Sequence, residues 1–144
     1  GQTPFTPAVS TYFALDAACT EFLADGHGQR QAMYARRNRL VREGLAKLGM
    51  VPLTRTGRES NSVVTASVPD GVEFQDLYDG LKARGYIVYG CKDVLAERFF
   101  QVANMGDLDD DQISLFLLAV EDVLGQLRKK AGVQRKRRKV LSFS

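Results

Sequence analysis

The run FFQVANMGD, residues 99–107, decides the fold of this chain, because it is a short apolar strand that ends on a glycine turn. One polar side chain, Gln101, interrupts the apolar residues of that strand, and a helical pattern begins soon after the turn. In a strand this short, a polar insertion favours a ligand-facing position over a packing position. Gln101 is therefore the first candidate for a binding residue.

Outward from this run, alternating and 3.6-residue patterns of apolar residues predict the remaining elements. The predicted helices cover residues 6–25, 29–48, 73–84 and a stretch that begins near residue 109, and the predicted strands cover 50–53, 62–68, 86–89 and 99–103. The strand at 50–53 contains Pro52, which cannot donate to a ladder, so we expect it at a sheet edge. This order of elements predicts an α+β fold, with a small, mostly antiparallel sheet and helices packed on one face.

Helix ends and buried stripes follow from the same patterns. Thr6 followed by proline is typical of an N-cap at the first helix. The second helix is expected to bury the apolar side chains of Met33, Leu40, Leu45 and Leu48. Three successive aspartates at 109–111 suit the positive N-terminus of the last helix.

The length of 144 residues suits one domain with a core of its own. No apolar run is long enough to span a bilayer and no signal-peptide pattern opens the chain, so we expect a cytoplasmic protein. The chain begins with Gly1 rather than methionine, which suggests a piece of a longer protein. We divide it into a linking segment and helix at 1–26, a small α+β domain at 27–130 and a basic tail at 131–144.

The net charge of +3 conceals a split between this tail and the rest of the chain. Eight of the 20 basic residues lie in residues 128–139, with no acidic residue among them, and the remainder carries 12 basic and 17 acidic residues. A basic run of this kind binds nucleic acid or directs nuclear import in some proteins. It lacks interleaved aromatic residues, so we favour a disordered, solvated tail and do not expect a nucleic-acid partner.

Few other residues carry a chemical signal. His27 is the only histidine, which excludes a multi-histidine metal site, and Cys19 and Cys91 match no zinc or redox spacing. The aspartates at 107–111 lack the spacing of a calcium loop, so no metal is expected. Thr3 and Thr6 precede a helix and could hold a phosphate through their hydroxyl groups, although helix capping is the simpler role.

Several blocks in order resemble the C-terminal region of class V pyridoxal-phosphate aminotransferases, above all that of 2-aminoethylphosphonate–pyruvate aminotransferases. The blocks are residues 5–6, 61–66, 74–92 and 100–107, of which LKARGYIVY at 81–89 is particularly similar. At 100–107 the family typically has Phe-Arg-Ile-Gly-Asn-Ile-Gly-Asp. The resemblance covers the chain up to about Arg128.

This resemblance implies the small C-terminal domain of a dimeric enzyme, preceded by a linking helix. The family's Schiff-base lysine lies upstream of the matched region, so the chain alone should not catalyse amino transfer. The resemblance implies that Thr6, and Thr3 beside it, contact the phosphate of pyridoxal 5'-phosphate in a neighbouring subunit. It also implies that Gln101 contacts the substrate, at the position where the family has an arginine that grips a carboxylate or phosphonate.

Three functions remain open from the sequence. The first is the C-terminal domain of an aminotransferase that moves an amino group from 2-aminoethylphosphonate to pyruvate, orients the substrate anion and closes the site. Its partners would be an upstream cofactor domain, a second subunit and a small amino or keto acid or aminophosphonate. The alternatives are a free-standing α+β module whose basic tail binds nucleic acid, and a plain interaction domain.

Overall fold

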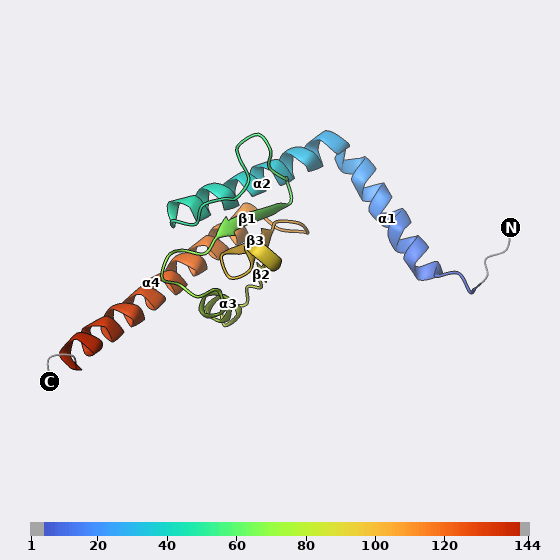
Figure 1. The fold of residues 1–144 in the computed structure, drawn as a ribbon. Coiled ribbons are helices and arrows are strands. Elements are labelled where there is room, and N and C mark those ends of the chain that lie inside the picture. The colour runs from blue at the N-terminus through green and yellow to red at the C-terminus, as the bar shows by residue number, and fades with distance from the viewer. Residues whose placement is uncertain (1–4, 142–144) are drawn as a thin grey trace. The chain divides into compact units, whose positions relative to one another are not determined.

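A computed structural model describes residues 5–141 of the chain, except for the side chains of residues 27 and 133–141. The chain divides into two compact units, Gly1–Met33 and Tyr34–Ser144. Each unit is described by itself below, with elements labelled as in Figure 1.

The first unit contains helix α1 (Val9–Asp25) and the start of helix α2 (His27–Lys47). The N-cap of α1 is Ala8, with no side-chain hydrogen bond, so the predicted cap at Thr6 is wrong. Proline fixes the chain two residues before the helix, where the amide of Val9 donates to the carbonyl of Pro7 (2.9 Å). The helix ends at Gly26, whose φ of 79° is readily reached only by glycine.

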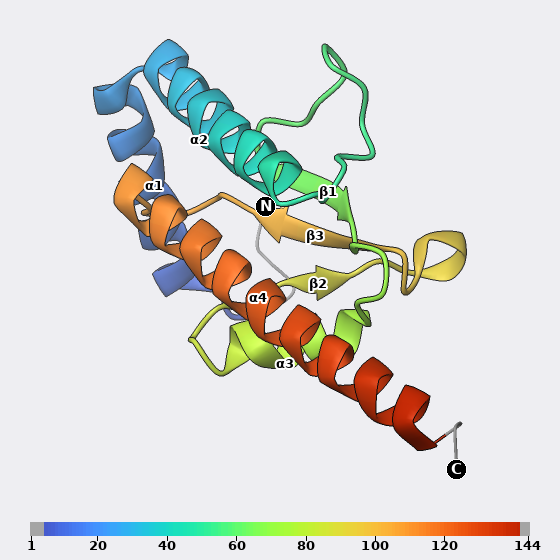
Figure 2. The same cartoon turned by 90° about the vertical axis from the view of Figure 1, so that its left-hand side faces the viewer.

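The second unit contains a three-stranded antiparallel sheet in the order β1-β3-β2. Its strands are β1 (Val63–Ser67), β2 (Tyr89–Gly90) and β3 (Phe99–Ala103). Figure 2 shows the three strands side by side. The predicted edge strand before β1 is reduced to a single bridge between Pro52 and Ala66.

Helices α3 (Phe74–Lys82) and α4 (Asp110–Leu141) complete this unit, with a 3-10 turn, η1 (Asp93–Leu95), between β2 and β3. Both views place α2 on the β1 side of the sheet and α3 on the β2 side (Figures 1 and 2). The predicted starts of α3 and α4 agree with the structure to within one residue.

The helices cover one face of the sheet, as predicted. Burial alternates along the strands, so that Val64 and Ala66 of β1 and Phe100 and Val102 of β3 point into the core. The helices and the loops between them bury the rest of that core, namely Val41, Leu45, Met50, Leu77, Leu81, Val88, Ile113, Phe116, Val120, Val123 and Leu124. The fold is therefore α+β, with one covered and one open face of the sheet.

Two glycines allow α2 and α3 to approach α4 closely. A Cβ atom on Gly44 of α2 would lie 2.4 Å from Cδ1 of Leu117, and one on Gly80 of α3 would lie 2.6 Å from Cγ1 of Val123. Real side chains do not come that near, so each glycine forms a notch that receives one side chain of α4.

Three further sequence predictions differ from the structure. Leu45 of α2 is buried as predicted, but Leu40 is exposed and its neighbour Val41 is buried instead. The predicted strand at 86–89 shortens to Tyr89–Gly90, because the amide of Tyr86 donates to Leu81 at the end of α3 and not to β3. Helix α4 continues to Leu141, where we expected disorder beyond residue 130, because Gly132 alone does not stop a helix otherwise rich in Arg, Lys and Leu.

Candidate functional site

Gln101 lies in the middle of the open face of the sheet. It is the central residue of β3, and both neighbouring strands pair with it, through Thr65 of β1 and Tyr89 of β2. Since residues directly opposite one another in a sheet share a face, these three side chains form one polar row. Gln101 and Tyr89 are exposed, and Thr65 is partly buried.

The side chains of this row carry no charge, and a single weak hydrogen bond joins two of them. The amide nitrogen of Gln101 donates to Oγ1 of Thr65 at 3.4 Å, the long limit of a hydrogen bond. The side chain can therefore turn towards a ligand at little cost. It offers one amide donor and one carbonyl acceptor but no charge.

Arg98, the nearest arginine in sequence, does not replace the missing charge at Gln101. It precedes β3 and lines a separate, polar cavity of about 410 Å³ together with Asp70, Glu73 and Glu97. Gln101 is not among the residues that line this cavity. Arg98 therefore does not supply a charge to the Gln101 row.

The two predicted phosphate ligands lie in the other unit. Thr3 is outside the described residues, and Thr6 is exposed on the segment before α1. No hydrogen bond occupies the Thr6 hydroxyl in the described structure, so it is free to donate to a phosphate oxygen. Thr6 and Gln101 belong to separate units, and each is described by itself.

The turn after β3 is held by a buried polar network that the sequence did not predict. The side-chain amide of Asn104 donates to the backbone carbonyls of Asn61 (3.0 Å) and Tyr34 (3.3 Å). The side-chain amide of Asn38, also buried, donates to Oδ1 of Asn104 (3.2 Å). This network ties the end of β3 to the segment before β1 and to α2.

Residues near the start of α4 add further polar contacts next to this network. Asp109 caps the helix reciprocally with Gln112, since each backbone amide donates to the other side chain (2.7 and 2.8 Å). Arg36 of α2 forms an ion pair with Asp110. The buried Arg37 donates from Nη1 to the carbonyl of Gly106 (3.2 Å). The sequence gives little signal for these contacts, because Arg37 and Asn38 stand within the polar run RRNR at 36–39 and only Asn104 directly follows an apolar strand.

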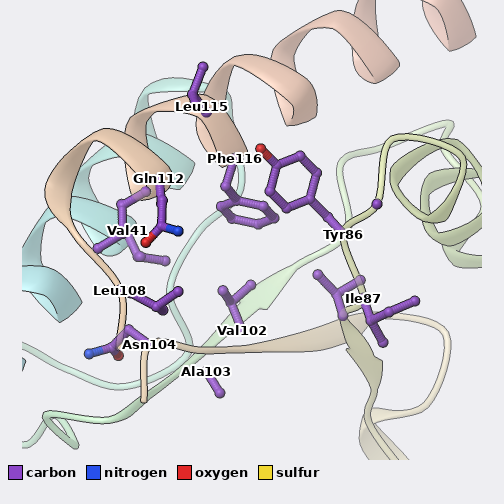
Figure 3. Close-up of a pocket in the computed structure, with 13 residues that line it drawn as sticks. Val41, Tyr86, Ile87, Val102, Ala103, Asn104, Leu108, Gln112, Leu115 and Phe116 are labelled. Atoms are coloured by element: carbon purple, nitrogen blue, oxygen red, sulfur yellow. The ribbon is translucent and has the colours of Figure 1, made fainter. Parts of the chain in front are cut away.

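An apolar cavity of about 400 Å³ lies on the helix-covered side of the sheet, where residues 85–88 separate from β3 (Figure 3). Val102, Ile113 and Phe116 form its walls, and Tyr86 packs edge-on against Phe116 with ring centroids 5.5 Å apart. The exposed side chain of Gln101 is not among the lining residues, so the two features are separate.

The described residues offer little for metal binding. They contain no group of three or more His, Cys, Asp or Glu side chains placed to hold a metal ion. Within the same part of the chain, no helix combines the length and the apolar character needed to cross a membrane.

The fold has counterparts among solved structures. The α+β architecture of the second unit matches that of aminotransferase small domains. The structure of an alanine–glyoxylate aminotransferase from Nostoc sp. superposes with a TM-score of 0.80 at 21% sequence identity. The match covers 85% of this chain and 33% of the Nostoc chain.

Two curated relatives make the relationship more specific. A 2-aminoethylphosphonate–pyruvate transaminase from Burkholderia ambifaria is 33% identical over 131 residues, which cover 88% of this chain and 35% of the relative. An uncharacterized aminotransferase from Methanocaldococcus jannaschii is 29% identical over 138 residues, which cover 92% of this chain and 36% of the relative. The chain is thus similar to the C-terminal part of class V aminotransferases. It spans about a third of the length of these relatives, and no family model matches it.

Proposed function

We propose that this chain is the C-terminal domain of a pyridoxal-phosphate-dependent aminotransferase that transfers an amino group between 2-aminoethylphosphonate and pyruvate. The observation that carries the proposal is the similarity along most of the chain to a transaminase of that name. The open sheet face supports it, because it presents a polar row at the place where the resemblance puts the substrate. An upstream cofactor domain, a second subunit and a cytoplasmic location belong to the same proposal.

In this proposal Gln101 orients the substrate through its side-chain amide. The amide N–H donates to a phosphonate or carboxylate oxygen, while Thr65 and Tyr89 border it on either side. An arginine would grip the same anion with a charged, bidentate fork. A neutral amide should bind it more weakly by about 1.5–3 kcal/mol, unless another group compensates.

The residues present here fit one part of the cofactor. The unoccupied hydroxyl of the exposed Thr6 can donate to a phosphate oxygen, and Thr3, the other proposed phosphate ligand, is outside the described residues. Neither of the two cavities described above is lined by Thr6, so Thr6 would contact the phosphate only and the ring would be held elsewhere. When bound, pyridoxal phosphate supplies the electron sink for amino transfer.

The test uses the longest natural protein that contains this chain. We expect cofactor absorbance in the visible range and amino transfer from 2-aminoethylphosphonate to pyruvate. A folded protein with neither property would overturn the aminotransferase proposal.

The role of Gln101 has its own test in the same protein. Gln101→Arg should lower KM for 2-aminoethylphosphonate by about 10- to 100-fold, because it restores a charged fork. Arg39→Lys, a conservative change at an exposed position on α2, is the matched control and should leave KM unchanged. No change in KM with Gln101→Arg would remove Gln101 from the substrate site without affecting the broader proposal.

A further inference from the structure

Arg37 is a buried cation without a carboxylate partner. Its side chain lies on α2 and the residue is only 6% exposed. Four ion pairs are present in the described structure, and none of them involves Arg37. A buried charge is costly unless it is paired and fully hydrogen-bonded, so this arrangement calls for an explanation.

The hydrogen bonds of Arg37 leave one edge of its guanidinium group open. Nη1 donates to the carbonyl of Gly106, whereas Nε is buried and has no partner among the described residues. Nη2 makes no hydrogen bond to the described protein either, and it is not fully buried. Nε and Nη2 point the same way along one edge of the planar group, which is an arrangement that grips an oxyanion with two parallel hydrogen bonds.

The surroundings keep the guanidinium in place and do not neutralise it. Gly106 belongs to the turn that Asn104 and Asn38 hold, so the acceptor of Nη1 is fixed. Asp110 at the start of α4 is engaged by Arg36 through Oδ2, and its buried Oδ1 makes no hydrogen bond to Arg37 or to any other described residue. Residues 133–144 contain no Asp or Glu and cannot supply a side-chain carboxylate.

We propose that Arg37 is an anion-binding residue whose Nε–Nη2 edge receives a carboxylate or phosphate group. Two sources of this chemistry are possible, a small free anion or an acidic side chain of a second copy of the chain. The site is separate from the proposed aminotransferase role, because Arg37 packs against the turn before α4, whereas Gln101 lies on the open face of the sheet.

The decisive measurement is a titration of the 144-residue chain with inorganic phosphate and with succinate, against chloride at the same ionic strength. The resonance of the Arg37 Nε–H group in a nitrogen-15 spectrum should shift saturably, and the Tm should rise in parallel. Arg37→Gln should abolish the rise in Tm. Arg37→Lys keeps the charge without the fork and should weaken binding by about 10- to 100-fold.

Arg39→Gln is the matched control, since it removes the same charge from an exposed position on the same helix. It should leave both responses intact. If a second copy supplies the anion, sedimentation should instead show self-association that Arg37→Gln abolishes and Arg39→Gln does not.

The proposal is overturned if the Arg37 Nε–H resonance is unmoved by either anion and the chain does not self-associate through Arg37. It is equally overturned if Arg39→Gln weakens the response as much as Arg37→Gln does. The spectrum of the unmutated chain decides the free-anion case even if Arg37→Gln fails to fold.

Discussion

The two faces of β3 place neighbouring residues under opposite constraints. Phe100 is fully buried, stacks on Phe74 of α3 (ring centroids 6.5 Å apart) and fills the space beneath the helices. Gln101, the next residue, points to the open face and has one long hydrogen bond. Packing therefore fixes the residue type at 100, whereas position 101 can change without disturbing the fold. A strand of this kind can carry a polar, outward-facing residue at little cost in stability.

The largest expected effect is a difference in stability between substitutions of Phe100 and of Gln101. Phe100→Ala should lower the free energy of unfolding by about 3–5 kcal/mol, because it leaves a cavity in the core. Gln101→Ala should change it by less than about 0.5 kcal/mol. Urea unfolding of both variants measures the difference. Similar losses would show that the open face also contributes to stability.

The end of β3 should give the next largest effect, because there a polar residue is buried. Asn104→Ala removes a hydrogen bond from each of the carbonyls of Asn61 and Tyr34 and leaves the side-chain amide of Asn38 without its acceptor, which should cost about 2–4 kcal/mol. Asn61→Ala is the matched control, since it keeps the backbone carbonyl that accepts from Asn104. Urea unfolding again measures both variants, and an equal loss in the two would argue against the network.

The outer surface of the helices should behave like the open face and show a small effect. Arg84, just after α3, donates from Nε to Oδ2 of Asp122 on α4 (3.1 Å), and this hydrogen bond lowers the pKa of Asp122. A carboxyl with a lowered pKa in the folded state stabilises the protein above its ordinary pKa, and the contribution is lost as the pH falls through the lowered value.

Asp122→Asn should therefore reduce the fall in Tm between neutral and acidic pH, by a small amount because the pair is exposed. Asp76→Asn, on α3 and outside the four ion pairs, should leave the pH profile unchanged. An unchanged profile for Asp122→Asn would mean that the Arg84 contact does not persist in solution.

The smallest effect concerns the thiol of Cys91, which is neither fully buried like Phe100 nor exposed like Gln101. Cys91 is partly buried, and its amide donates to the carbonyl of Phe99 (3.1 Å). Burial raises the pKa of the Cys91 thiol, so it should react with iodoacetamide more slowly than the exposed Cys19. We expect a difference of about 2- to 10-fold at pH 8, measured by mass spectrometry of the two peptides, that disappears in urea. Equal rates in the folded chain would contradict the burial of Cys91.

Local patterns in the sequence predicted most of the fold. The periodicity of α4, the β-branched residues of β1 and the apolar run of β3 each depend on neighbours within a few positions, and all three elements begin within one residue of the predicted position. The start of β2 was mispredicted because the amide of Tyr86 donates to Leu81 at the end of α3 and the Tyr86 ring packs on Phe116 of α4, 30 positions away in sequence. Leu45 is buried as predicted, but Leu40 is exposed because α2 turns Val41, the next residue, towards the core in its place.

The candidate site could be predicted only in part. Gln101 was predicted to face a ligand because a polar residue interrupts a short apolar strand; this signal is local, and its binding role stays a prediction. The network of Asn38 and Asn104 joins residues 66 positions apart, and the open edge of Arg37 depends on the carbonyl of Gly106. Such features depend on which backbone groups meet in space, and residue types alone do not reveal them.

The two notches at Gly44 and Gly80 have a mechanical consequence. Leu117 and Val123 stand six residues apart on α4, which is about 9 Å along the helix axis, and each is seated in a notch of a different helix. Helix α4 cannot slide along its axis unless both side chains leave their notches together. A pulling force on the C-terminal end of α4 would thus be opposed by steric contacts at both notches, and the load would be shared between α2 and α3.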